Sequence, residues 1–134
     1  IKLSNKLVEN SRNFITKIWS ANNFLELNDC KWNKNINLKN LKLPINQWIL
    51  NEFMKMQDLV YKTIEVIRFD EAAKHAYQFA CNSFGDWYLE CVQPIFNSRN
   101  KTEIQEAKLF SSFMMAHILK ILHPFIPFVT ETVW

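Results

Sequence analysis

Apolar residues recur at steps of three and four along most of this chain, and this spacing restricts the possible folds more than any other feature. The clearest run follows Pro44 and consists of Ile45, Ile49, Phe53, Met56, Val60 and Ile64. An α-helix brings such positions to one face, which then has to be buried against other elements. Because proline is tolerated in the first turn of a helix, we expect a helix to begin at Pro44. Its apolar face is widened by Trp48, Leu50 and Leu59.

The same spacing predicts three more helices, over residues 5–25, 69–94 and 102–122. Residues 26–43 are predicted to form an ordered loop with a short helical turn near residues 38–41. A last helical turn follows the prolines of HPFIPF and is truncated at the end of the chain. The predicted fold class is therefore all-α, a helical bundle of four main helices plus a truncated C-terminal helix. Residues 1–134 form a single domain, which we expect to be a piece of a longer polypeptide.

Local signals refine the ends and the middle of these helices. Asp70 is expected to cap the third helix, and Thr102 together with Gln105 forms a capping box for the fourth. Gly85 is the only glycine of the chain and lies inside the third helix. Glycine there costs about 1 kcal/mol relative to alanine. We therefore expect close packing or a local bend at Gly85.

The stretch NSFGDWYLE lies near the C-terminal end of the third predicted helix. Trp87 and Tyr88 extend a wide apolar face, so we expect neighbouring helices to enclose this segment. Asp86 and Glu90 are one helical turn apart. The expected partners of these acids are Lys or Arg side chains of a neighbouring helix, or helix-end amides.

Composition excludes several classes of protein. Hydrophobic residues make up 49% of the 134 residues and aromatic residues 14%, which is too apolar for a disordered segment. No apolar run approaches about 18 residues, so no membrane-spanning helix is expected. The first residues lack the layout of a signal peptide. The three cysteines fit no zinc-binding spacing and are expected to be small buried hydrophobic residues in a reducing compartment.

Positive charge is concentrated in the first third of the chain. Residues 1–43 contain eight Lys or Arg and three acidic residues, a net charge of +5. The whole chain carries +3, so residues 44–134 carry −2. This asymmetry indicates an anionic partner for the first third.

The first predicted helix has two different faces when its residues are placed at about 100° per step. One face is apolar: Leu7, Val8, Phe14, Ile15, Ile18, Trp19 and Leu25. The opposite face carries Lys6, Glu9, Asn10, Arg12, Asn13, Thr16, Lys17, Ser20 and Asn23, with Phe24 as an aromatic exception. Amides, hydroxyls and cations predominate there over Glu–Lys pairs, which favours recognition of hydrogen-bonding groups; a merely solvated face is the alternative. Trp32 either stacks on a base or anchors its loop to the bundle.

No residues in the chain form a recognisable catalytic or cofactor site. A single glycine excludes a glycine-rich phosphate loop, and His75, His117 and His123 are well separated. No nucleophile, base and orienting group can be assembled. We therefore predict no catalytic residue, no metal ligand and no cofactor within this chain.

Four segments carry a family likeness: SRNFITKIWSANNF at 11–24, NQWIL at 46–50, RFDEAAKHAYQFACNSFGDWYLE at 68–90 and LHPFIPFVTETVW at 122–134. They resemble the anticodon-binding helical domain of class Ia aminoacyl-tRNA synthetases, most closely the valine-type members. The likeness covers almost the whole chain in the right order, and the DWYLE segment is its most specific part. An isoleucine-type synthetase domain and a helical protein-interaction module are the alternatives.

The resemblance implies a partner and a site. The parent enzyme would join valine to its tRNA with ATP and Mg²⁺ in the cytoplasm, through domains outside these residues and without a membrane. This domain would bind the anticodon arm of the tRNA, with the DWYLE helix mainly structural. Its expected contacts are charge from Arg12 and Lys17, base or sugar contacts from Asn13, Thr16, Ser20 and Asn23, and stacking by Phe24 and Trp32.

The chain also departs from the family pattern. The family's two Asn residues and its Arg are replaced by Thr16, Ser20 and Asn23, which keeps this face polar. Its Asp-Arg pair is Asn46-Gln47 here, and the Cys before DWYLE is Gly85. Individual contacts therefore do not transfer from the family to this chain.

Overall fold

The computed structural model describes residues 2–30 and 38–125, with side chains from residue 12 onward except that of residue 40. All regular structure in these ranges is helical, and its elements are α1 Lys2–Leu27, η1 Leu38–Asn40, α2 Pro44–Glu65, α3 Phe69–Gln78, η2 Phe79–Tyr88, α4 Leu89–Phe96 and α5 Lys101–Leu122. The three elements α3, η2 and α4 follow one another without a break and form one central rod. The predicted all-α fold with four main helices is confirmed. The predicted C-terminal helix lies outside the described residues.

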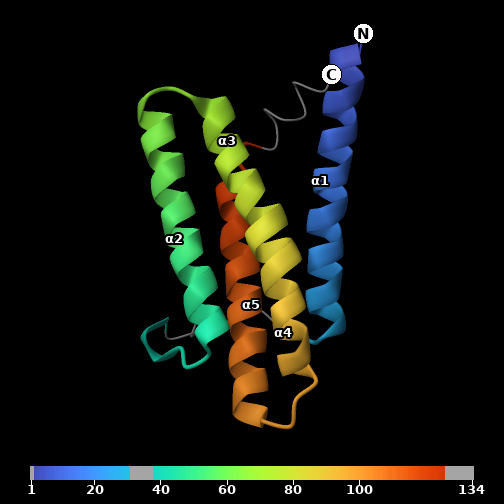
Figure 1. Cartoon of the computed structure of the whole chain (residues 1–134), viewed down its shortest axis with the longest axis vertical. Coiled ribbons are helices and arrows are strands. Elements are labelled where there is room, and N and C mark those ends of the chain that lie inside the picture. The colour runs from blue at the N-terminus through green and yellow to red at the C-terminus, as the bar shows by residue number, and fades with distance from the viewer. Residues whose placement is uncertain (1, 31–37, 126–134) are drawn as a thin grey trace.

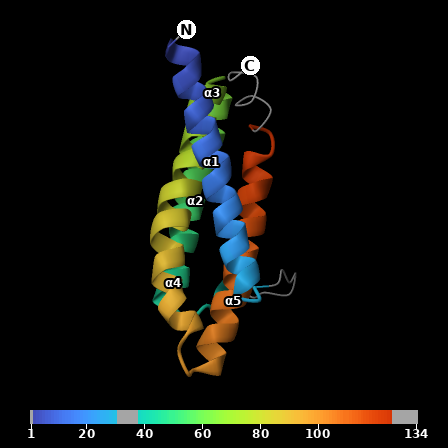
Figure 2. The ribbon, with the colours of Figure 1, turned by 90° about the vertical axis from the view of Figure 1, so that its right-hand side faces the viewer.

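The four rods run up and down along one long axis (Figure 1). The central rod holds them together: α2 packs along α3 and η2, α1 packs against η2 and α5, and α5 packs against α3 and α4. A view turned by 90° shows α1 lying alongside both the central rod and α5 (Figure 2). One side of α1 therefore faces the bundle and the other faces solvent.

α2 begins at Pro44, as predicted. Its buried side chains follow the predicted stripe: Asn46, Ile49, Phe53, Met56, Val60 and Thr63. Trp48 and Leu59, which we expected to widen this stripe, are exposed instead. Both lie roughly 100° around the helix from the centre of the stripe, where no helix of the described ranges covers α2.

α1 buries a narrower face than its sequence suggested. Phe14, Ala21 and Leu25 are buried at steps of seven and four, and they face the bundle. The predicted face also contained Ile15 and Trp19, but these side chains are 54% and 67% exposed. That part of the prediction is wrong, because within the described residues α1 packs on the bundle along one edge, and Ile15 and Trp19 lie outside that edge.

Trp87 and Tyr88, the adjacent aromatic residues of the central rod, differ in burial. Tyr88 is fully buried, whereas Trp87 is 65% exposed. The predicted enclosure of the segment therefore holds for Tyr88 and is wrong for Trp87. Adjacent residues on a helix are about 100° apart, so the packing that buries Tyr88 can leave Trp87 on the exposed side of the rod.

A chain of hydrogen bonds runs from the buried Tyr88 hydroxyl to the start of α2. This hydroxyl donates to Oδ1 of Asn46 at 2.7 Å and lies 3.1 Å from Oγ of Ser111. Nδ2 of Asn46 donates to the Glu106 carboxylate at 2.9 Å. The same carboxylate accepts from the backbone N–H groups of Lys42 at 2.7 Å and Leu43 at 2.9 Å. A side chain of α5 thus caps the N-terminus of α2.

Two predicted caps are wrong. The cap of α5 is Asn100, whose Oδ1 accepts from the backbone N–H groups of Thr102 at 3.1 Å and Glu103 at 3.3 Å. Because α5 begins before Thr102, that residue is already inside the helix. α3 begins at Phe69, so Asp70 lies in its first turn, where its charge still complements the helix dipole.

Candidate nucleic-acid interface

The polar face of α1 is accessible to solvent in the folded helical bundle. Arg12, Asn13, Thr16, Lys17 and Ser20 are exposed, and Asn23 and Phe24 are half-buried. Trp32, the remaining candidate residue, lies outside the described residues. The face therefore keeps its hydroxyls and cations available to a partner from residue 12 onward.

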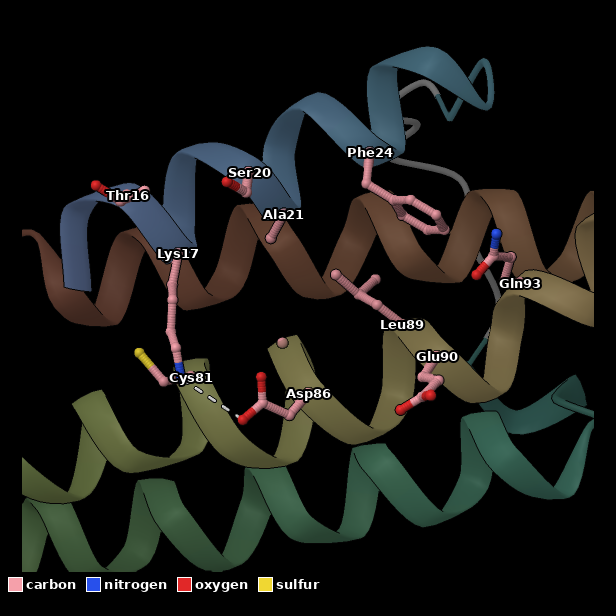
Figure 3. Close-up of a pocket in the computed structure, with 11 residues that line it drawn as sticks. Thr16, Lys17, Ser20, Ala21, Phe24, Cys81, Asp86, Leu89, Glu90 and Gln93 are labelled. Carbon is pink, nitrogen blue, oxygen red and sulfur yellow. Dashed lines mark ion pairs between the residues drawn. The ribbon is translucent and has the colours of Figure 1, made fainter. Parts of the chain in front are cut away.

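Part of this face forms one wall of a groove between α1 and the central rod (Figure 3). From α1 the groove is lined by Thr16, Lys17, Ser20, Ala21 and Phe24, and from the central rod by Cys81, Gly85, Asp86, Leu89, Glu90 and Gln93. It is open to solvent and has a volume of about 350 Å³. The structure therefore brings four of the predicted site residues together around one concavity. Arg12, Asn13 and Asn23 are not among the lining residues.

Small residues and a local change in helix geometry leave room for the groove. Ala21 is the buried residue of α1 that lines it, and Gly85 lines it from the central rod. Gly85 lies within η2, a π-helical segment of ten residues. A Cβ atom at this position would lie 3.0 Å from the carbonyl oxygen of Ala80. This contact is with the backbone of the same rod, five residues earlier, and it accompanies the π-helical geometry of the segment rather than the approach of another helix.

One ion pair bridges the groove. Nζ of Lys17 lies 3.6 Å from the Asp86 carboxylate, with the two side chains 51% and 56% exposed (Figure 3). This confirms the expectation that Asp86 pairs with a cation of a neighbouring helix. An exposed pair of this kind contributes about 0–1 kcal/mol, because water and salt screen it. Lys17 can therefore exchange Asp86 for another anion at little cost.

Two aromatic side chains of α1, Phe24 and Trp19, differ in their surroundings. The ring of Phe24 lies 6.0 Å from the ring of Phe96, so it packs against the bundle and forms a wall of the groove. Trp19 was not expected on the exposed face, because its apolar character suggested burial. Its exposed indole lies on the solvent side of α1, within about 40° of Arg12 and Asn23 around the helix.

Other chemistry is limited in the described part of the chain. No group of three His, Cys, Asp or Glu side chains there could hold a metal ion. Burial raises the pKa of Cys81 to about 11, so its thiol stays protonated at neutral pH.

Cys81 is buried and Cys30 half-buried, but Cys91 is exposed, which corrects the expectation for this cysteine. None of the described helices combines the length and apolarity that a membrane span requires.

Comparison with known proteins identifies the family. Residues 46–134 match the model of the anticodon-binding domain of tRNA ligase. This chain belongs to that family. The match covers about two thirds of the chain, including α2 from Asn46 onward, the central rod and α5, but not α1.

Relatives of this anticodon-binding domain extend the likeness to α1. The chain is 43% identical to a valine–tRNA ligase of Pelagibacter ubique, 40% to that of Caulobacter vibrioides and 39% to that of Brucella suis, each over 134 residues and the whole chain. It spans only 15% of the length of each of these proteins. No solved structure matches the chain significantly.

Proposed function

We propose that this domain binds the anticodon arm of a tRNA as part of a valine–tRNA ligase. Membership of the anticodon-binding family and the names of its relatives support this assignment. The observation that carries it is the groove between α1 and the central rod, where hydroxyls, a cation and an aromatic ring converge on an open concavity. Unpaired RNA bases are bound by such combinations of hydrogen-bonding and stacking groups.

Charge on α1 would position the RNA backbone. Arg12 is exposed on α1 one helical turn before Thr16, and Lys17 is held only by its weak pair with Asp86. Contacts between cations and phosphates set affinity and orientation but carry no sequence information. Arg12 and Lys17 are therefore the residues that bind any anticodon arm.

The remaining residues would contact bases and sugars. Thr16 and Ser20 present hydroxyls at the groove, and α1 also carries the amides of the exposed Asn13 and the half-buried Asn23. Trp19 offers the accessible ring for stacking on this face, whereas Phe24 supplies an apolar wall. Stacking of a base on an aromatic side chain contributes about 1–3 kcal/mol and is independent of base identity. Trp32 remains a second predicted stacking residue.

The parent enzyme would supply the chemistry. A valine–tRNA ligase joins valine to its tRNA with ATP and Mg²⁺, and those steps would take place in domains beyond this chain. The present domain would contribute anticodon recognition in the cytoplasm and contacts to the remaining domains.

The experiment is a titration of the domain with anticodon stem-loops of valine and isoleucine tRNAs at low and moderate salt. We expect tighter binding of the valine loop. Arg12→Ala plus Lys17→Ala should weaken binding about tenfold at low salt and lower the slope of log K against log salt by roughly 1.4, as expected for two lost phosphate contacts to a single strand.

The matched control is Lys62→Ala plus Lys74→Ala, which removes two exposed cations from α2 and α3. Equal loss of binding in both double variants would mean that binding depends on the overall positive charge of the domain and not on the α1 face. A preference for the isoleucine loop would assign the domain to an isoleucine-type enzyme. Equal binding of both loops and an unrelated hairpin would contradict anticodon recognition and favour a protein-interaction module.

A further inference from the structure

The wall of the groove opposite α1 is acidic. Asp86 of η2 and Glu90 of α4 lie one helical turn apart and both line the groove (Figure 3). Asp86 is paired with Lys17. The Glu90 side chain has no hydrogen bond or ion pair within the described part of the chain, although Thr16, Ser20 and Gln93 line the same space.

This distribution of charge excludes a phosphate from the interior of the groove. A phosphate placed between the two walls would face two carboxylates and only one cation, so a phosphate bound by Lys17 would have to lie outside the groove. A neutral group with N–H donors, by contrast, gains a charge-assisted hydrogen bond from an unpaired carboxylate. The apolar side chains of Ala21, Phe24 and Leu89 complete the lining and suit a flat ring. A nucleobase with an exocyclic amino group has both properties.

We propose that the groove accepts one unpaired anticodon base that carries an exocyclic amino group, and that Glu90 is the hydrogen-bond acceptor that reads it. This inference rests on the proposed function of the domain. Carboxylates accept hydrogen bonds from the amino group of cytosine in the same way at other nucleic-acid interfaces. Lys17 and Asp86 close one side of the groove, and Glu90 marks the position of the amino group.

A carboxylate acceptor at Glu90 would discriminate between valine and isoleucine tRNAs. Valine codons begin with GU, so valine anticodons end in adenine and cytosine, which both carry exocyclic amino groups. Isoleucine anticodons end in uracil, which presents a carbonyl oxygen where cytosine presents its amino group. A carboxylate repels that oxygen and accepts from the amino group. Glu90 would thus reject the wrong base as well as bind the right one.

The test measures binding of valine anticodon stem-loops in which single bases lack the amino group. Zebularine replaces cytidine and purine riboside replaces adenosine, one anticodon position at a time. With the unmodified domain we expect about a tenfold loss of affinity at one of these positions, the size of one base contact. Glu90→Gln should abolish most of that difference, because a neutral amide accepts more weakly and also donates.

Glu65→Gln is the control, since it removes the same charge from an exposed position at the end of α2. If neither analogue weakens binding, or if Glu90→Gln retains the same discrimination as Glu65→Gln, the inference is overturned while anticodon binding stands. If the unmodified domain does not prefer anticodon loops over an unrelated hairpin, the proposed function fails and the inference with it. Circular dichroism of each variant verifies that its helices are intact.

Discussion

At the scale of single residues, the buried hydroxyl of Tyr88 is the polar group on which the core depends most. It donates to Asn46 of α2 and lies next to Ser111 of α5, and all three side chains are buried. Burial raises the pKa of Tyr88, so the hydroxyl remains a donor far into the alkaline range. Asn46 also explains a departure from the family pattern, because an aspartate at this position would have no donor for Glu106.

We predict that Tyr88→Phe lowers the free energy of unfolding by about 1–3 kcal/mol, because it leaves the Asn46 carbonyl without its buried donor. Urea denaturation of the domain measures this loss. Tyr61→Phe is the control: Tyr61 is exposed and only accepts from Gln57 at 3.2 Å. Its removal should change stability by less than about 0.5 kcal/mol. Equal effects of the two substitutions would contradict the role of the buried network.

At the scale of elements, the ends of the helices are stabilised by different parts of the chain. α5 is capped locally by Asn100, three residues before Glu103, whose N–H it accepts. α2 lacks a local side-chain cap and is capped by Glu106, more than sixty residues away. Local pattern reading can find the first kind of cap but not the second.

The capping of α5 makes a direct prediction. Asn100→Ala should cost about 1 kcal/mol of stability, because the N–H groups of Thr102 and Glu103 lose their acceptor. Thr102→Ala should lower the stability by only a few tenths of the loss expected for Asn100→Ala, since the Thr102 hydroxyl does not cap a backbone N–H group of α5. Thermal or urea denaturation of both variants measures the difference. A larger loss from Thr102→Ala would restore the capping box read from the sequence and contradict the observed cap.

At the scale of the whole molecule, the burial of ionisable groups makes the free energy of unfolding change with pH in the alkaline range. The pKa values of Cys30 and Cys81 rise from the ordinary 9.0 to about 11, mainly because burial disfavours the thiolates. Between these values the unfolded chain releases protons that the folded bundle keeps, so raising the pH favours unfolding.

We therefore predict that the free energy of unfolding falls progressively between about pH 9 and pH 11. Urea denaturation at a series of pH values, under reducing conditions, measures the decline. Cys81→Ala should reduce its slope, whereas Cys91→Ala, at an exposed position, should leave it unchanged. A stability that stays constant over this range would show that the thiols are not buried in the folded state.

Features that depend on neighbouring residues along the chain were predicted from the sequence, and features that depend on helix packing were not. The sequence alone determined the all-α class, the start of α2 and its stripe from Ile49 to Val60, because helical periodicity is written in the spacing of apolar residues. It also located the polar side chains of α1 from Arg12 to Ser20, since a face without apolar residues has no reason to be buried.

Only the tertiary structure decided which apolar residues stay exposed and where the groove lies. Trp19 and Trp87 have the same local signature as buried aromatics, but no helix in the described part of the chain covers them. The groove needs α1, η2 and α4 at once, and its Lys17–Asp86 pair joins residues far apart in the chain. Such features depend on how the helices pack against one another, and the periodicity of a single helix does not predict that packing.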